Sequence, residues 1–257
     1  MIGIYKENVK TIPALVVVDS TKTTEALPIL TYFHGFTSAK EHNLPLAFLM
    51  AEKGFRVILP DSEHHGERSK GKTAAEMQLL FWAIVRQNII DLQDIYESYQ
   101  SKGLFLDDKF GVAGTSMGGI TTAAVLTQYK WINAAAILMG SPKLEKYAHE
   151  LVREVSKYRD LPFTEKEIQH VYEQLQAYDL SKHMEKLAER PILFWHGKKD
   201  DVVPYDHSFD FYCEVQKLYE NKEKIHFISE ENQSHKVSRH AILHTVDWFT
   251  KHLSIKQ

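Results

Sequence analysis

A glycine-rich stretch at residues 111–119, with the sequence GVAGTSMGG, constrains the fold of this chain more than any other segment. It follows an apolar run that predicts a buried strand, and it leads into small residues that predict a helix able to lie close to a sheet. Gly114, Ser116 and Gly118 form the G-x-S-x-G pattern of a nucleophile elbow. Such a turn strains the backbone of the serine, and side chains two residues to either side of it would collide. The pattern therefore predicts a raised Ser116 hydroxyl, with the N–H groups at the helix start facing any oxyanion formed on it.

Length and composition are those of a single globular domain. The 257 residues can bury a sizeable core, and the fractions of 44% hydrophobic and 25% charged residues are ordinary. The net charge of −3 argues against a nucleic-acid partner, because proteins that bind nucleic acids usually carry a basic excess. No apolar run reaches the roughly 18 residues of a membrane span, and the N-terminus lacks the profile of a secretory signal. Because Cys213 is the single cysteine, no intrachain disulfide is possible, and we expect a cytoplasmic protein with no membrane partner.

Strand-like segments alternate with helical ones along most of the chain. This alternation predicts an α/β fold with a mostly parallel central sheet, flanked by helices on both faces. In open sheets of this kind, functional side chains gather at the carboxyl ends of the strands. Residues 143–189 differ, because they are highly charged and helical and contain no clear strand. Strands are predicted at 2–5, 12–18, 28–33, 55–59, 110–113, 134–139, 191–197 and 224–229, and helices at 43–53, 74–101, 118–126, 205–220 and 235–253.

A glycine-rich sequence of this kind could also form an ordinary tight turn. The prediction of a nucleophile therefore depends on finding catalytic partners for Ser116. A general base must take the hydroxyl proton, and a third group must hold that base in one tautomer. Hydrolases with a nucleophile elbow carry the acid and then the histidine after the serine. Asp200 and Asp201 both follow a predicted strand, and the residues themselves leave both open as the acid.

His235 is the histidine best placed to be the base. It lies in a polar segment between the last predicted strand and the body of the last helix, and a loop there can carry a side chain over the sheet. His240 and His244 share one helix face, where we expect a surface pair rather than a metal site. The histidines after Asp200 that fall inside predicted regular elements are His207, His226, His240, His244 and His252.

Two backbone N–H groups are expected to form an oxyanion hole. One is the N–H of Met117, at the start of the helix. The other comes from the turn after the third predicted strand, where Phe36 is preferred and Gly35 or Thr37 are alternatives. His34 precedes the serine in the chain, so we expect it to bond the loop backbone rather than to take part in catalysis.

Nearly the whole chain resembles the α/β-hydrolase superfamily, and within it the esterases near dienelactone hydrolase and the prolyl oligopeptidase catalytic domain. The resemblance implies that Asp200 is the acid, because it matches the aspartate of the family's His-Gly-x-x-Asp motif. It also implies that residues 143–189 form a helical cap, with 1–142 and 190–257 as the hydrolase core. Dienelactone hydrolase itself uses a cysteine nucleophile, so its own reaction is not implied for Ser116. The matching segments are HGF at 34–36, PD at 60–61, HGERS at 65–69, GTSMGG at 114–119, HGKKDDVVP at 196–204, and His235.

The leading hypothesis is a serine hydrolase that cleaves small carboxylic esters of short to medium acyl chains, without a cofactor or a metal. Ser116 would attack the ester, His235 would move the proton, and Asp200 would orient His235. The N–H groups of Phe36 and Met117 would hold the oxyanion. A peptidase or amidase of the prolyl oligopeptidase type would use the same triad. Such enzymes usually carry a large N-terminal domain for which this chain has no room, so esters are favoured.

Two other classes of function have weaker support from the sequence. A non-catalytic binding protein on the same fold would not need a complete set of triad residues. A metallohydrolase would need Asp61, His64 and His65 around one ion, and adjacent histidines seldom face the same metal. The oligomeric state is left open.

The predicted cap has an apolar face. We expect this face to lie above the site, where it would roof the pocket and limit its depth. The residues that recur at helical spacing are Leu144, Tyr147, Leu151, Val152 and Val155.

Overall fold

One sheet forms the centre of the computed structural model, which describes residues 1–158 and 160–254, except for the side chains of residues 107 and 108. Its eight strands lie in the order β1-β2-β4-β3-β5-β6-β7-β8. β1 and β2 form an antiparallel hairpin and β2 pairs antiparallel with β4, whereas all pairs from β4 to β8 are parallel. The predicted mostly parallel sheet is confirmed. The strands are β1 (Ile2–Val9), β2 (Ile12–Asp19), β3 (Leu27–Phe33), β4 (Arg56–Pro60), β5 (Phe105–Thr115), β6 (Ala134–Leu138), β7 (Ile192–Gly197) and β8 (Ile225–Glu230).

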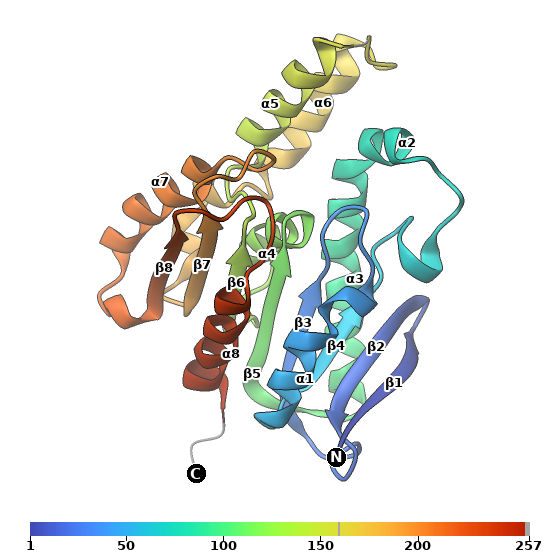
Figure 1. Ribbon diagram of the computed structural model, residues 1–257, viewed down its shortest axis with the longest axis vertical. Helices are drawn as coiled ribbons and strands as arrows, with labels where there is room; N and C mark the ends of the chain where they lie inside the picture. The colour runs from blue at the N-terminus through green and yellow to red at the C-terminus, as the bar shows by residue number, and fades with distance from the viewer. Residues whose placement is uncertain (159, 255–257) are drawn as a thin grey trace.

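Helices cover both faces of the sheet (Figure 1). Helices α1 (Leu44–Glu52) and α8 (Arg239–Leu253) pack on one face, and α3 (Phe81–Ser101), α4 (Met117–Gln128) and α7 (Tyr205–Val215) pack on the other. Successive side chains of a strand point to opposite faces of the sheet, so the core is divided into two layers, one under each set of helices. The buried side chains of β5 illustrate this division, because those of neighbouring residues in the strand belong to opposite layers.

Two layers of core residues result. On the α3 and α4 side, Val112 belongs to the cluster of Ile84 and Ile120, and on the α1 and α8 side Ala113 belongs to the cluster of Met50 and Phe249. α4 is buried along almost its whole length, because its small residues allow close approach to the sheet. No helix among residues 1–158 and 160–254 combines the length and apolar character required to cross a membrane.

The predicted helix at 74–101 is two helices, α2 (Ala74–Leu79) and α3, with a break at Leu80. Leu80 leaves helical geometry with φ −99° and ψ 2°. Residues 79–83 all line one cavity, and successive residues of a continuous helix point about 100° apart. The change of direction at Leu80 therefore lets Leu79 of α2 and Phe81 of α3, on its two sides, face the same space.

Other boundaries differ for local reasons. β5 begins at Phe105, ahead of its apolar part, because it pairs with β3 beyond the predicted start. α8 begins at Arg239 rather than at His235, because the Ser238 side chain accepts the Ala241 N–H and caps the helix. His235 is thereby left in a loop.

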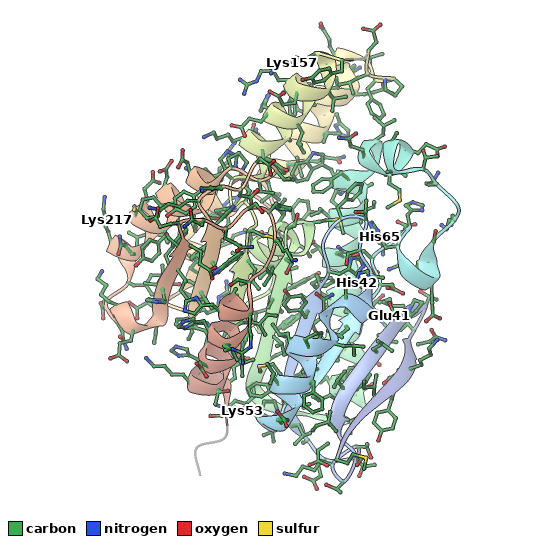
Figure 2. All side chains as sticks on the ribbon, viewed as in Figure 1. Glu41, His42, Lys53, His65, Lys157 and Lys217 are labelled. Atoms are coloured by element: carbon green, nitrogen blue, oxygen red, sulfur yellow. The ribbon has the colours of Figure 1, made fainter. Side chains whose placement is uncertain are left out.

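Residues between β6 and β7 form two long helices, α5 (Leu144–Ser156) and α6 (Glu165–Gln176), which extend beyond the carboxyl end of the sheet (Figure 1). Lys157 lies at the tip of this projection (Figure 2). Residue 159 of the predicted cap and residues 255–257 of the predicted core lie outside the described residues. The short 3₁₀ turns are η1 (Lys40–Asn43), η2 (Gly66–Arg68), η3 (Leu180–Lys182), η4 (Met184–Leu187), η5 (Gln216–Leu218) and η6 (Lys222–Lys224).

Candidate active site

Ser116 lies in the turn that joins β5 to α4. Its backbone has φ 55° and ψ −115°, which is a strained conformation for a residue with a side chain. A Cβ on Gly114 would collide with the backbone of Gly118, and a Cβ on Gly118 would collide with the backbone of Phe33. The two glycines are therefore required by close packing around the serine. This geometry is that of the predicted elbow, although Ser116 is only 9% exposed because it faces a cavity rather than open solvent.

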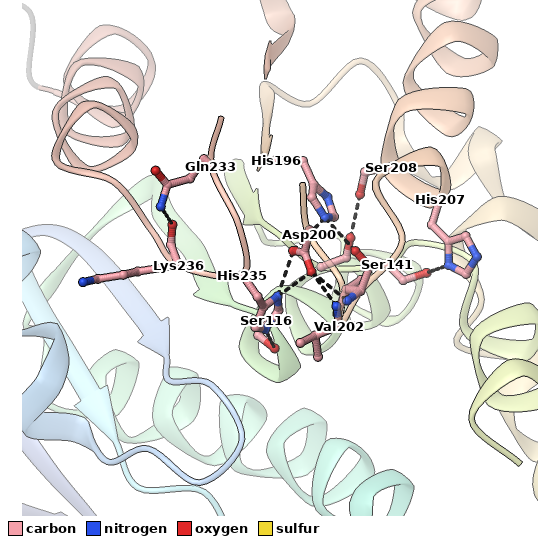
Figure 3. A network of polar contacts seen from close by, with 12 residues as sticks. Ser116, Ser141, His196, Asp200, Val202, His207, Ser208, Gln233, His235 and Lys236 are labelled. Atoms are coloured by element: carbon pink, nitrogen blue, oxygen red, sulfur yellow. Dashed lines mark hydrogen bonds and ion pairs between the residues drawn. The ribbon is translucent and has the colours of Figure 1, made fainter. Parts of the chain in front are cut away.

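The structure brings His235 and Asp200 to Ser116, as the sequence predicts (Figure 3). The Ser116 hydroxyl lies 2.8 Å from Nε2 of His235. Nδ1 of His235 lies 2.7 Å and 2.9 Å from the two carboxylate oxygens of Asp200. A hydroxyl, an imidazole and a carboxylate in this order can move a proton from the serine to the histidine.

Asp200 and its neighbour Asp201 have opposite surroundings. The Asp200 side chain is fully buried, and its Oδ1 accepts the N–H groups of Val202 and Val203, each at 2.9 Å. Burial alone would raise the pKa of Asp200, but its hydrogen bonds with His196 and His235 outweigh burial and hold that pKa well below its usual range. Asp201 is exposed. Only Asp200 is placed to keep a charged carboxylate against His235.

His196, at the end of β7, is a site residue that the sequence analysis did not assign. Its side chain is fully buried, and its Nε2 lies 3.1 Å from Oδ2 of Asp200 and 3.0 Å from the Val203 carbonyl. Both neighbours are acceptors, so Nε2 carries the proton and donates it to them. The spacing of His196 and Asp200 in the sequence is the signal that could have indicated this contact.

The loop after β3 passes beside the serine. A Cβ on Gly35 would lie 3.6 Å from Cβ of Ser116. The Thr37 N–H donates to Nε2 of His65 at 3.0 Å, so it is already engaged. Of the three oxyanion donors predicted in this loop, Phe36 and Gly35 remain. Phe36 lines the same cavity as Ser116.

His34 holds this loop rather than reaching the serine. Its Nδ1 donates to the Gly35 carbonyl at 2.8 Å, and its Nε2 accepts the Ser62 N–H at 3.0 Å. Burial lowers the pKa of His34 to about 4, so it is neutral at pH 7 and can accept that bond.

The alternative metal site does not assemble. Asp61 is buried and engaged with Lys40, whose Nζ lies 2.5 Å from its Oδ2. His65 uses its Nε2 for the Thr37 N–H and its Nδ1 for the Glu63 carbonyl at 2.9 Å. Within the described part of the chain, no group of three or more His, Cys, Asp or Glu side chains is arranged to hold a metal ion.

His240 and His244 form the expected pair on α8. Their Nε2 atoms lie 2.8 Å apart, and Nδ1 of His240 lies 3.2 Å from Glu230. The His240 side chain is 58% exposed. Neither histidine is hydrogen-bonded to Ser116, so His240 serves as a control position for His235.

Comparisons with known proteins give the family. The sequence matches the prolyl oligopeptidase family over residues 46–256. It is 43% identical over 255 residues to "Putative esterase YitV" of Bacillus subtilis, which covers 98% of this chain and 100% of that protein. It is 30% identical over 258 residues to "Esterase YjfP" of Escherichia coli, again over 98% of this chain and 100% of that protein. The solved structure of TT1662 from Thermus thermophilus matches 100% of both chains with a TM-score of 0.78 at 17% identity. The chain therefore belongs to the prolyl oligopeptidase family and has the α/β-hydrolase fold.

Proposed function

We propose that this protein is a serine esterase that hydrolyses small carboxylic esters through an acyl-enzyme. The observation that carries the proposal is the chain of hydrogen bonds from Ser116 through His235 to Asp200, at 2.8 Å and 2.7 Å. Two full-length relatives named as esterases support it. The chemistry needs no cofactor.

The reaction has two halves. Ser116 Oγ bonds to the acyl carbon while its proton passes to Nε2 of His235, and the tetrahedral intermediate then breaks its bond to the alcohol oxygen, which takes that proton. In the second half His235 takes a proton from water, whose oxygen attacks the acyl carbon. The second tetrahedral intermediate then breaks its bond to Ser116 Oγ, which takes the proton back from His235, and the carboxylic acid leaves. Asp200 stabilises the imidazolium that forms in each half and keeps the ring in one orientation.

Backbone N–H groups hold the oxyanion that forms in each half. In this proposal one is the N–H of Met117, the first residue of α4, where the partial positive charge of a helix N-terminus favours an anion. The other is the N–H of Phe36, in the loop that passes beside Ser116. Each such donor is worth roughly a hundredfold or more in rate.

Residues 143–189 act in this proposal as a cap over the site. Tyr147 of α5 donates its hydroxyl to the Val202 carbonyl at 3.2 Å, which ties the cap to the loop that carries Asp200. We expect the cap to limit the acyl chain to short or medium length. The cytoplasmic location stays a prediction from the sequence.

Peptide or amide hydrolysis is the second candidate, because the family match is to prolyl oligopeptidases. Paired substrates separate the two: p-nitrophenyl esters and p-nitroanilides of the same short acids. We expect rapid ester cleavage with little anilide cleavage, and no loss of activity with a chelator. Faster anilide cleavage would favour the amidase, and loss of activity on chelation would favour a metal mechanism.

A further inference from the structure

A cavity of about 800 Å³ begins at Ser116 and extends between the core and helices α5 and α6. One of its walls is aromatic. The ring centroids of Phe36 and Phe81 are 5.7 Å apart, those of Phe81 and Trp82 are 5.1 Å apart, and those of Trp82 and Tyr147 are 6.2 Å apart. All four side chains line the cavity, so a continuous row of rings leads from the serine to the cap.

The cap supplies an aliphatic wall. Val152 and Val155 of α5 and Ile168 and Val171 of α6 line the same cavity and are only half-buried. Much of the apolar face that the sequence predicts for α5 therefore borders open space rather than packed core. A half-buried apolar surface beside a reactive serine is suited to hold an apolar part of the substrate.

The position of His235 decides whether the acyl part or the alcohol part of the ester enters the cavity. In the tetrahedral intermediate the acyl carbon carries the Ser116 oxygen, the oxyanion, the alcohol oxygen and the acyl chain. The alcohol oxygen must lie within reach of Nε2 of His235, which protonates it. Among the described residues that line the cavity, Ser116 is present and His235 is not. The acyl chain is the remaining substituent that can enter the cavity.

We infer that this cavity is an acyl-binding site, and that the enzyme selects its substrates by a bulky apolar acyl group while tolerating varied alcohols. The inference rests on the proposed function. A volume of about 800 Å³ lies in the range that holds drug-sized ligands, and an acetyl group would leave most of the apolar walls uncovered. Each methylene buried against such walls is worth roughly a fourfold gain in binding.

The cavity lining also includes a polar pair, which disfavours long apolar chains. Arg86 of α3 donates to the Gln174 side chain of α6 at 2.6 Å, and both residues line the cavity. This polar bridge joins the core to the cap. A chain long enough to pass it would have to displace a charge-assisted hydrogen bond.

The first experiment varies one half of the ester at a time. Across p-nitrophenyl acetate, hexanoate and palmitate, we expect kcat/KM to rise roughly a hundredfold from acetate to hexanoate, through four buried methylenes, and then to fall. Across the methyl, butyl and octyl esters of hexanoic acid, we expect changes of less than about tenfold in kcat/KM, since the alcohol lies outside the cavity. A flat acyl series, or a preference that follows the alcohol, would overturn the inference.

The second experiment narrows the cavity. Ile168→Trp places a large ring in it, whereas Gln169→Trp puts the same ring on the next residue of α6, which is exposed and outside the lining. We expect Ile168→Trp to lower the hexanoate-to-acetate ratio of kcat/KM by roughly tenfold or more, since it displaces at least two methylenes, and Gln169→Trp to leave it unchanged. An equal ratio in both variants contradicts the inference.

Two controls keep the outcomes separate. Circular dichroism and the melting temperature report whether each variant has folded, and Val155→Phe on α5 replaces Ile168→Trp if that variant does not fold. If Ser116→Ala still hydrolyses acetate, the proposed function fails. If Ser116→Ala is inactive and the hexanoate-to-acetate ratio of kcat/KM does not change in the cavity variants, only the inference of an acyl-binding site is rejected.

Discussion

Asp200 and Asp201 carry the same charge in the same loop, but only one of them contacts a histidine. Asp200 is buried against His235, and Asp201 is exposed. We therefore predict that Asp200→Asn lowers kcat for ester hydrolysis by about 10⁴, because an amide favours the wrong tautomer of the histidine. Asp201→Asn is the matched control, and steady-state kinetics on one ester compare them. The reverse ranking of the two variants would move the role to Asp201.

A second residue-scale prediction concerns pH and His34. Its pKa is about 4 in the folded protein, so the unfolded chain binds a proton at higher pH than the folded one does. Stability from this group is fully present above the unfolded pKa of about 6.5 and is lost as the pH falls toward about 4. Between about pH 7 and about pH 5 the loss is roughly 2 kcal/mol.

Urea unfolding at those two pH values measures the loss. We expect His34→Asn to be less stable than the parent at neutral pH but to lose less stability on acidification. His240→Gln, at an exposed position, controls for the removal of a histidine. An unchanged pH dependence in His34→Asn would show that another group is responsible.

Residue types and their order were enough to predict that Ser116 and His235 lie together with an aspartate of the 200–201 pair, because a triad needs one of each kind, and the family resemblance selected Asp200. His196 was not assigned despite its spacing from Asp200, because their contact depends on how the loop after β7 folds back. The exclusion of Thr37 as an oxyanion donor likewise depended on His65, a distant residue that accepts the Thr37 N–H. Thr37 and His65 are 28 residues apart, and hydrogen-bond partners so distant in the sequence leave no periodic signal.

At the scale of elements, the elbow depends on the close approach of α4 to β3. We predict that Gly118→Ala destabilises the protein by about 1–3 kcal/mol or more, because its methyl group would enter the backbone of Phe33. Gly35→Ala is the matched control, since its nearest neighbour would lie at an ordinary 3.5 Å. Free energies of unfolding in urea compare the two variants. Equal stabilities would contradict the packing argument.

The sequence predicted the order and type of the main elements, since strand and helix periods differ clearly in a buried sheet. It did not predict the break at Leu80, because a run of helix-forming residues does not reveal where one helix ends and the next begins. It also placed the start of α8 too early. The Ser238 cap stops the helix short of His235 and leaves that side chain free to reach Ser116.

At the scale of the whole molecule, the site lies in a cavity between the core and the α5–α6 projection, and Ser116 is 9% exposed. A folded protein cannot bring its backbone to this serine without unfolding. We predict that the protein leaves a folded protein substrate such as lysozyme intact while it hydrolyses a small ester in the same tube. Mass spectrometry of the mixture makes the comparison, and efficient cleavage of the folded substrate would contradict the proposed role of the cap.

The most direct test of the central claim is fluorophosphonate labelling of the parent protein and of Ser116→Ala, combined with ester hydrolysis by each. We predict one label on Ser116 in the parent, and in the variant neither labelling nor measurable hydrolysis, with a loss of several orders of magnitude in kcat and an unchanged melting temperature. A Ser116→Ala variant that still binds the label, or that hydrolyses the ester at a rate near that of the parent, would contradict the account.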